Sequence, residues 1–232
     1  MNKKQFTAEQ LLTRWEIRRE VQNIMGKYSQ SYCIKQEGAL PQFWSGRDDI
    51  SLGLNQGYYI GQAAVNGYYA AIEAETKLAS QLIAARFPQK LQGKTEEELF
   101  GVGQISYRPI DTAVIEVADN LQTAKGLWVV RGMVEKVTTS GPISYWDFSY
   151  WAVDFILEAG AWKIWHMTMF TDIQCPVGGN WGKDTMYPHE GVEIPEPTVK
   201  EHQYTGYGED FISMVAPRLP EPYDTFANTF SY

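Results

Sequence analysis

Asp154 and His166 lie in two apolar runs on either side of Gly160, where a short turn would place an acid beside an imidazole. If Gly160 is the middle of a three-residue hairpin loop, Asp154 faces His166, because the two are equally far from Gly160 in sequence. Opposed side chains share one face of a sheet and lie about 5 Å apart at Cβ. An imidazole beside a carboxylate among apolar side chains is suited to moving a proton. We therefore predict an acid–base pair, with a satisfied buried polar contact as the alternative.

Length and composition limit the classes of function. A chain of 232 residues can bury one full core and is shorter than is usual for two large domains. The net charge of −8 and the lack of a Lys/Arg stripe argue against nucleic acid as a partner. No run approaches the roughly 20 apolar residues that cross a bilayer, and the N-terminus is not followed by the apolar segment of a signal peptide. We therefore expect a cytoplasmic protein with no membrane partner.

The cysteines and histidines do not predict a metal centre. Cys33 and Cys175 are too few for a disulfide framework and lack the spacing of a zinc site. Cys175, His189 and Glu190 have no paired spacing and lie in an irregular tail. The sequence therefore indicates a reducing compartment and no metal.

Two long helices are predicted in the first half of the chain. Residues 7–10, with the sequence TAEQ, have the form of a capping box, so a helix begins there. Apolar residues then recur at three- and four-residue steps in a stripe that ends with Tyr28 and Tyr32, which we expect to face the core. The run 61–86 is rich in Ala, Leu, Ile, Gln and Glu and ends before Pro88, which predicts the second helix.

The period of the sequence changes from helical to extended in the second half. Residues 112–118, 123–138 and 145–157 are typical of strands separated by turn-prone residues, and the run after Gly160 is a fourth. Helices followed by consecutive strands predict an α+β fold in which the helices pack on one face of a curved antiparallel sheet. Such a sheet encloses a conical cavity.

The last part of the chain differs again in composition. From residue 176 it is rich in proline, which makes regular structure improbable. It also carries more aromatic residues than a typical disordered segment. We therefore divide the chain into a domain at residues 1–175 and an irregular extension at residues 176–232 that wraps the domain or a dimer partner.

Three segments resemble the SnoaL-like branch of the nuclear transport factor 2-like superfamily. They are the first-helix segment around Tyr28, the strand pair AVIEVADNLQTAKGLW at residues 113–128, and the AGAWKI segment that leads to His166. The resemblance implies a cone-shaped α+β barrel, commonly a dimer, whose members include dehydratases, ketosteroid isomerases and polyketide cyclases. It also implies a small hydrophobic ligand, a homo-oligomer, and chemistry that needs no metal or organic cofactor.

The chain departs from the pattern of the family's dehydratases at two positions. Where those enzymes often have an Asp five residues after the helix tyrosine, this chain has Cys33. A His that precedes the first strand of the pair is also missing, with Tyr107 and Arg108 in that neighbourhood. These departures leave Asp154 and His166 as the chain's own candidates, joined by Tyr28.

The predicted function is a cofactor-independent lyase (dehydratase) or isomerase that acts on a hydrophobic cyclic or aromatic hydroxy-carbonyl compound. His166 would be the general base or acid and Asp154 its orienting partner. A buried phenol, from Tyr28 or Tyr107, would donate to the enolate oxygen. Loss of a β-hydroxyl would complete an elimination, and reprotonation elsewhere an isomerisation. The alternative function is a non-catalytic small-molecule-binding or dimeric scaffold protein of the same fold.

Further side chains are predicted to bind substrate. Arg131 interrupts an apolar strand and could bind a carboxylate or phosphate, although a surface position is an ordinary alternative. Asp172 shares alternation with His166 and lies either at the mouth of the cavity or at a solvated strand end. The predicted substrate-binding set is Tyr32, Tyr107, Trp128 and Arg131.

Overall fold

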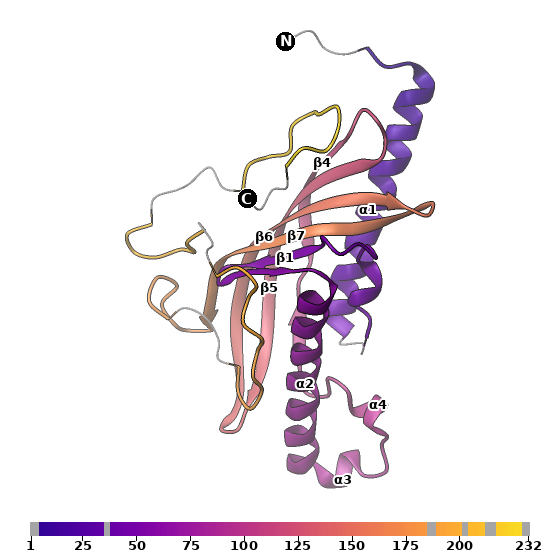
Figure 1. Cartoon of the computed structure of the whole chain (residues 1–232). Helices are drawn as coiled ribbons and strands as arrows, with labels where there is room; N and C mark the ends of the chain where they lie inside the picture. The colour runs from indigo at the N-terminus through magenta and orange to yellow at the C-terminus, as the bar shows by residue number, and fades with distance from the viewer. Residues whose placement is uncertain (1–4, 35–37, 185–188, 201–203, 212–216, 229–232) are drawn as a thin grey trace.

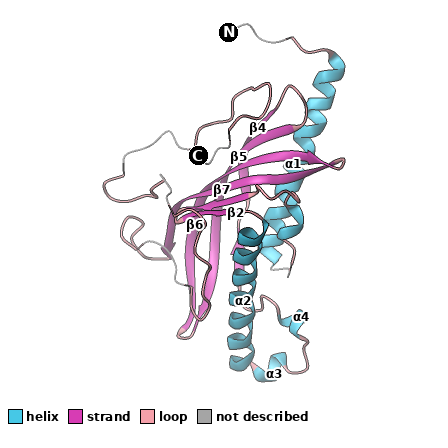
Figure 2. Cartoon of the chain, viewed as in Figure 1, coloured by secondary structure: helices cyan, strands magenta, loops and turns pink. Residues whose placement is uncertain are grey.

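The computed structural model describes residues 5–34, 38–184, 189–200, 204–211 and 217–228. In this part of the chain, one curved sheet of seven strands lies beside two long helices (Figures 1 and 2). The sheet does not close on itself. The predicted α+β fold class is confirmed.

The two long helices have the predicted positions. Helix α1 spans Ala8–Ile34 and helix α2 spans Gln62–Arg86. The predicted capping box is present: the amide of Gln10 donates to Thr7 Oγ1 at 3.2 Å, and the amide of Thr7 donates to Gln10 Oε1 at 2.9 Å. The short helices are η1 (Pro41–Phe43), α3 (Pro88–Leu91) and α4 (Glu96–Leu99). No helix in the described ranges has the length and apolar content that a membrane span requires.

The strands follow the order β2-β1-β7-β6-β5-β3, and β4 also pairs with β5. Their bounds are β1 Ser51–Leu54, β2 Gly57–Ile60, β3 Ile105–Tyr107, β4 Ile110–Val117, β5 Thr123–Thr138, β6 Gly141–Glu158 and β7 Ala161–Pro176. Strands β4 to β7 match the predicted strands, whereas β1, β2 and β3 were not predicted. Strand β1 pairs with β7 in parallel, and the other pairs are antiparallel.

The turn between β6 and β7 is shorter than predicted. Glu158 pairs with Ala161, so the turn contains Ala159 and Gly160 only, and the predicted three-residue loop is wrong. Both turn residues have positive φ, 49° for Ala159 and 81° for Gly160. Positive φ at both central residues is typical of a type I′ turn, whose twist matches that of the flanking strands.

A bulge in β7 restores the predicted pairing farther from the turn. Phe155 pairs with Ile164 and Asp154 pairs with His166, which leaves Trp165 as an extra residue on β7. A second register shift leaves Asp172 as another extra residue, because Phe148 pairs with Ile173 and Ser149 with Thr171. Asp154 therefore faces His166 as predicted, although the register near the turn differs.

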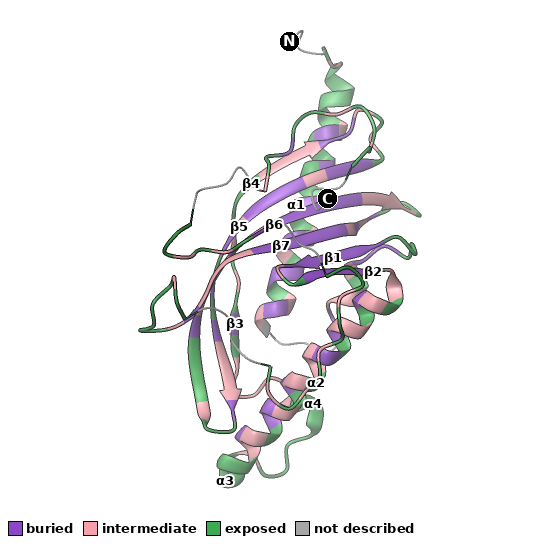
Figure 3. Cartoon of the chain, turned by 60° about the vertical axis from the view of Figure 1, so that its left-hand side comes forward, coloured by how far each residue is buried: buried purple, intermediate pink, exposed green. Residues whose placement is uncertain are grey.

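Alternation along β6 separates two faces of the sheet. Trp151, Val153 and Phe155 enter the main hydrophobic core with residues of α1 and α2, whereas Ala152 belongs to a second cluster. Asp154 lies between two of these core residues, so its side chain takes the face away from the helices. Figure 3 shows that β1, β2 and the central parts of β6 and β7 are largely buried, whereas most of β4 is half-buried or exposed.

The described parts of residues 176–232 contact the domain of the same chain. Backbone hydrogen bonds join them to three places, in the pairs Tyr58 with Val199, Asp172 with Tyr207, and Asp119 with Tyr223. The first of these lies at β2, the second at β7 and the third beyond β4. The extension thus reaches both ends of the sheet.

A glycine in β5 leaves room for a buried indole. A Cβ at Gly126 would meet the ring of Trp128 at 2.2 Å, and Trp128 is fully buried. Gly126→Ala should therefore lower the free energy of unfolding by roughly 1–3 kcal/mol, through overpacking. Urea titration measures it.

Gly67→Ala in α2 is the matched control, because a Cβ there approaches nothing more closely than Pro195 at 4.0 Å. This change should stabilise the chain, by up to about 1 kcal/mol of helix propensity. A Gly126→Ala chain as stable as the unaltered one would contradict the packing described for Trp128.

Candidate functional site

A cavity of about 570 Å³ lies between α2, the curved sheet and the C-terminal extension. One part of its wall is aromatic and apolar and includes Tyr32, Tyr68, Trp151 and Met169. Residues 205–208, 210 and 211 of the extension also line it. A cavity of this size is typical of small-molecule sites, which combine apolar walls with a few polar groups.

A largely buried ion pair lines the cavity. Arg108 Nη2 donates to Asp147 Oδ2 at 2.8 Å, and the two side chains are 13% and 4% exposed. Arg108 also donates to Ser106 Oγ at 2.8 Å, and its guanidinium lies 5.0 Å from the ring centre of Tyr32. Gln174 donates to the same carboxylate oxygen of Asp147 at 3.3 Å. The guanidinium is therefore held against an aromatic wall.

A second charged cluster lines the same cavity. Lys136 Nζ donates to Glu75 Oε2 at 2.8 Å, and His189 Nδ1 lies 3.2 Å from both oxygens of Glu75. Burial raises the pKa of Glu75, but the hydrogen bonds from His189 and Lys136 outweigh it, so that pKa lies below its ordinary value. Burial lowers the pKa of Lys136, and Glu75 only partly opposes this effect. The cluster is an imidazole–carboxylate pair supported by an ammonium group.

Tyr28 is buried in the core near the cavity. Its hydroxyl is 2.6 Å from that of Tyr69, which accepts from Trp44 Nε1 at 3.1 Å. Burial raises the pKa of Tyr28 well above its ordinary value. Tyr28 packs on Tyr32, which lines the cavity, but Tyr28 itself is not part of the lining.

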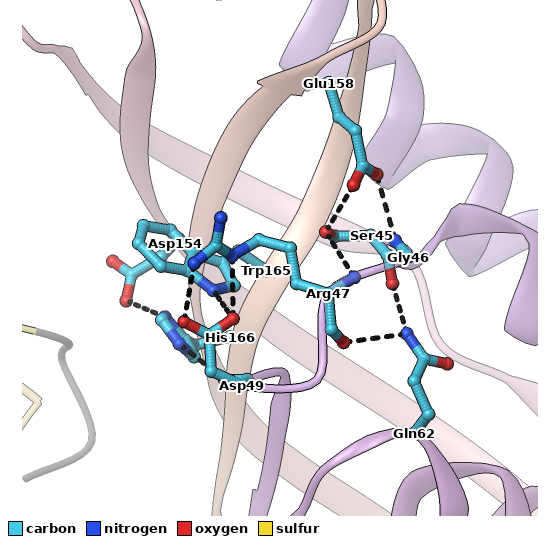
Figure 4. A network of polar contacts seen from close by, with 9 residues as sticks. All are labelled: Ser45, Gly46, Arg47, Asp49, Gln62, Asp154, Glu158, Trp165 and His166. Carbon is cyan, nitrogen blue, oxygen red and sulfur yellow. Dashed lines mark hydrogen bonds and ion pairs between the residues drawn. The ribbon is translucent and has the colours of Figure 1, made fainter.

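Asp154 and His166 form the predicted contact, as Figure 4 shows. His166 Nδ1 lies 3.2 Å from Asp154 Oδ2, and His166 Nε2 lies 3.1 Å from the backbone oxygen of Asp49. Lys125 Nζ donates to the other oxygen of Asp154 at 3.0 Å. Both ring nitrogens of His166 therefore face oxygen acceptors within the protein, and neither is directed at the cavity.

The C-terminal extension covers this pair. Phe226 stacks on His166 with ring centres 5.7 Å apart, and Lys125 donates to the backbone oxygen of Asn228. His166 is 5% exposed and Asp154 1% exposed. Since Asp154 takes the face of the sheet away from the helices, the structure does not bring Tyr28 together with Asp154 and His166.

The predicted substrate-binding residues take different positions. Tyr32 lines the cavity. Tyr107 is 55% exposed and Arg131 is also exposed, and neither is part of the cavity lining. Trp128 is fully buried and donates from Nε1 to Gln22. Asp172 lines the cavity and accepts a hydrogen bond from Tyr204.

The charged residues of the cavity were mostly missed by the sequence analysis. Lys136 and Asp147 interrupt apolar strands, which is a signal of the kind noted for Arg131. Glu75 is one of two glutamates in an Ala-rich stretch of α2 and is not distinguished by sequence. His189 lies in the irregular extension, where no periodic pattern predicts its contact with Glu75.

No protein-family model matches the chain, and no curated protein matches its sequence. Among solved structures, LinA is 16% identical, with a TM-score of 0.49 over 77% of this chain and 99% of that chain. A putative scytalone dehydratase from Novosphingobium aromaticivorans is 13% identical, with a TM-score of 0.47 over 80% of this chain and 95% of that chain. A variant of Rv3472 from Mycobacterium tuberculosis, described as a protein of unknown function, is 12% identical, with a TM-score of 0.46 over 70% of this chain and 76% of that chain.

Likenesses of this degree carry no information on the chemistry of the cavity. The architecture itself is informative: α1 and α2 pack on one face of a curved, unclosed and largely antiparallel sheet. The chain therefore has an α+β fold with the arrangement of helices and curved sheet that its sequence resemblance implied.

Proposed function

We propose that this chain is a cofactor-independent lyase or isomerase that acts on a small cyclic or aromatic hydroxy-carbonyl compound. The observation that supports this proposal is the composition of one cavity. An imidazole–carboxylate pair and a largely buried guanidinium line the same space as several aromatic side chains. These are the groups that proton abstraction beside a carbonyl requires.

His189 is the general base in this proposal. When its Nδ1–H donates to Glu75, the other ring nitrogen, Nε2, carries the lone pair that accepts a proton. Glu75 fixes the orientation of the ring and stabilises the imidazolium that forms. Lys136 also holds Glu75 in place, through a hydrogen bond to its Oε2. The pair thus replaces Asp154 and His166 in the role predicted for them from sequence.

Arg108 is the group that stabilises the developing oxyanion. Its guanidinium is held by Asp147 and Ser106, so little rearrangement is needed as charge develops on the substrate. Tyr32 and Trp151 provide flat surfaces for a ring-shaped substrate. If the proton held by His189 passes to the β-hydroxyl, that group leaves the enolate as water and the reaction is that of a lyase. If His189 returns the proton to another carbon of the enolate, the reaction is that of an isomerase.

A non-catalytic binding protein is the second candidate function. The pairing of the cavity's cations favours it: Arg108 and Lys136, which line the cavity, are each already paired with a carboxylate. The sealed position of His166 also leaves the base predicted from sequence without access to the cavity. Such a protein would retain a ligand without changing it.

Incubation with a panel of uncharged cyclic and aromatic hydroxy-carbonyl compounds separates the two candidates. Mass spectrometry should show the loss of one water for a lyase, or an unchanged mass with a new retention time for an isomerase. Tight retention of a compound without conversion would favour the binding protein.

The two described histidines should differ in their effect on turnover. His189→Ala should lower kcat/KM by at least about 100-fold, the usual contribution of a general base. His166→Ala should preserve kcat/KM per folded molecule but lower the free energy of unfolding by about 1–3 kcal/mol, because it leaves Asp154 with one partner fewer. The reverse pattern, with activity lost only in His166→Ala, would restore Asp154 and His166 as the catalytic pair.

Glu75 should make stability depend on pH in the acid range. Its pKa is lower in the folded chain than its ordinary value of 4.5, so its ionised form stabilises the fold above that value. This stabilisation is lost as the pH falls through the lowered pKa. Glu75→Gln should therefore be less stable than the unaltered chain at pH 7 and should show a shallower loss of stability below pH 4.5, measured as urea midpoints. Parallel curves for the two chains would contradict the contacts assigned to Glu75.

A further inference from the structure

The positive charges of Arg108 and Lys136 in the cavity lining are compensated within the protein. Arg108 is paired with Asp147, and Lys136 is paired with Glu75. Among the described lining residues these two are the basic ones besides His189, and five lining residues are acidic: Glu75, Glu135, Asp147, Asp172 and Asp210. An anion that enters the cavity would therefore find each basic residue of the described lining already paired with a carboxylate.

We propose that the cavity discriminates against anionic ligands, so that its substrate class is uncharged carbonyl compounds and not carboxylic acids or phosphate esters, with Asp147 and Glu75 setting this preference. The inference rests on the proposed function in that it concerns the same cavity. It adds the charge of the substrate and the residues that determine it.

The buried ion pair of Arg108 and Asp147 gives the strongest support for this preference. A ligand carboxylate could bind Arg108 fully only by displacing Asp147, whose side chain is 4% exposed. Asp147 would then be a buried carboxylate without its main partner, which is strongly unfavourable. Gln174 also donates to Asp147, which holds the carboxylate in place. The pair thus accepts the hydrogen-bonding oxygens of a ligand that arrives neutral. Proton transfer from such a ligand to His189 leaves the total charge in the cavity unchanged, whereas a ligand carboxylate adds a negative charge beside Asp147.

The cluster of Glu75, Lys136 and His189 also disfavours anionic ligands. Glu75 neutralises Lys136 and also contacts His189, so that an anion approaching either group meets the carboxylate as well. Like charges at a binding site cost affinity and suppress wrong ligands. Neutral polar side chains also line the wall. They are Ser149 and the two glutamines Gln104 and Gln174, whose amide nitrogens donate within the protein and whose amide oxygens can accept from a ligand hydroxyl.

The test uses two probes of the same size and shape that differ in charge, 2-naphthamide and 2-naphthoate. Isothermal titration calorimetry at pH 7 with the full chain should show the amide binding at least about 10-fold more tightly than the carboxylate. Asp147→Asn, which leaves Arg108 uncompensated, should tighten 2-naphthoate binding by at least about 10-fold and change 2-naphthamide binding little. Asp111→Asn removes the same charge from an exposed position of β4 outside the cavity lining and should leave both affinities unchanged.

Glu75→Gln provides a second variant if Asp147→Asn fails to fold, as judged by circular dichroism, and it should shift the ratio of the two affinities in the same direction. An unaltered chain that binds the carboxylate as tightly as the amide, or that binds neither probe, overturns the inference. So does a ratio that neither variant changes. Binding with the expected ratio but no turnover of any compound would leave the inference standing and remove the proposed function. Turnover of an anionic substrate would do the opposite.

Discussion

Strand β6 is paired along most of its length on both edges, with β5 and with β7, and this pairing determines which face each of its side chains takes. A strand held on both sides cannot rotate a residue from one face to the other without breaking its ladder. Asp147, Ser149 and Trp151 therefore line the cavity, whereas Asp154 faces outward. The chemistry available in the cavity follows from this alternation.

The cost of burying charge explains why the buried charged residues on both faces of the sheet are paired. A buried ion pair is rarely a net source of stability, because desolvation offsets most of the attraction. A buried charge therefore needs a partner of opposite sign. Arg108 with Asp147, and Lys125 with Asp154, are such pairs on opposite faces of the sheet. The pair of Arg108 and Asp147 borders a cavity large enough for a ligand, whereas the pair of Lys125 and Asp154 is covered by the C-terminal extension. In the proposed function, Arg108 takes part in the chemistry, whereas Lys125 hydrogen-bonds the extension at Asn228.

Local signals in the sequence predicted much of the fold. The capping box at Thr7, the boundary before Pro88 and the change of period after residue 112 depend on neighbouring residues, so they could be identified without tertiary information. The contact of Asp154 with His166 was also predicted, but it arises from a two-residue turn combined with the bulge at Trp165. A bulge has no reliable sequence signal. The predicted contact is therefore correct although the three-residue loop from which it was predicted is wrong.

The candidate site depended on information that a single sequence does not contain. The face taken by His166 is determined by the sheet as a whole and by the extension that packs over it. The contact between Glu75 and His189 joins positions far apart in the chain through a segment with no periodic pattern. Charge in an apolar strand was noted at Arg131, yet Lys136 and Asp147 give the same signal and are the ones that line the cavity. Periodicity locates strands but does not by itself distinguish their two faces.

Proton exchange in D₂O tests the central claim, that this cavity abstracts a proton beside a carbonyl group, without requiring the natural substrate. The probe is 2-tetralone, an uncharged ring-shaped ketone, and NMR follows the replacement of the hydrogens next to its carbonyl by deuterium. Our account predicts exchange that is faster with the unaltered chain than in buffer and that returns to the buffer rate with His189→Ala. Equal exchange rates for the unaltered chain, the His189→Ala variant and buffer would contradict it.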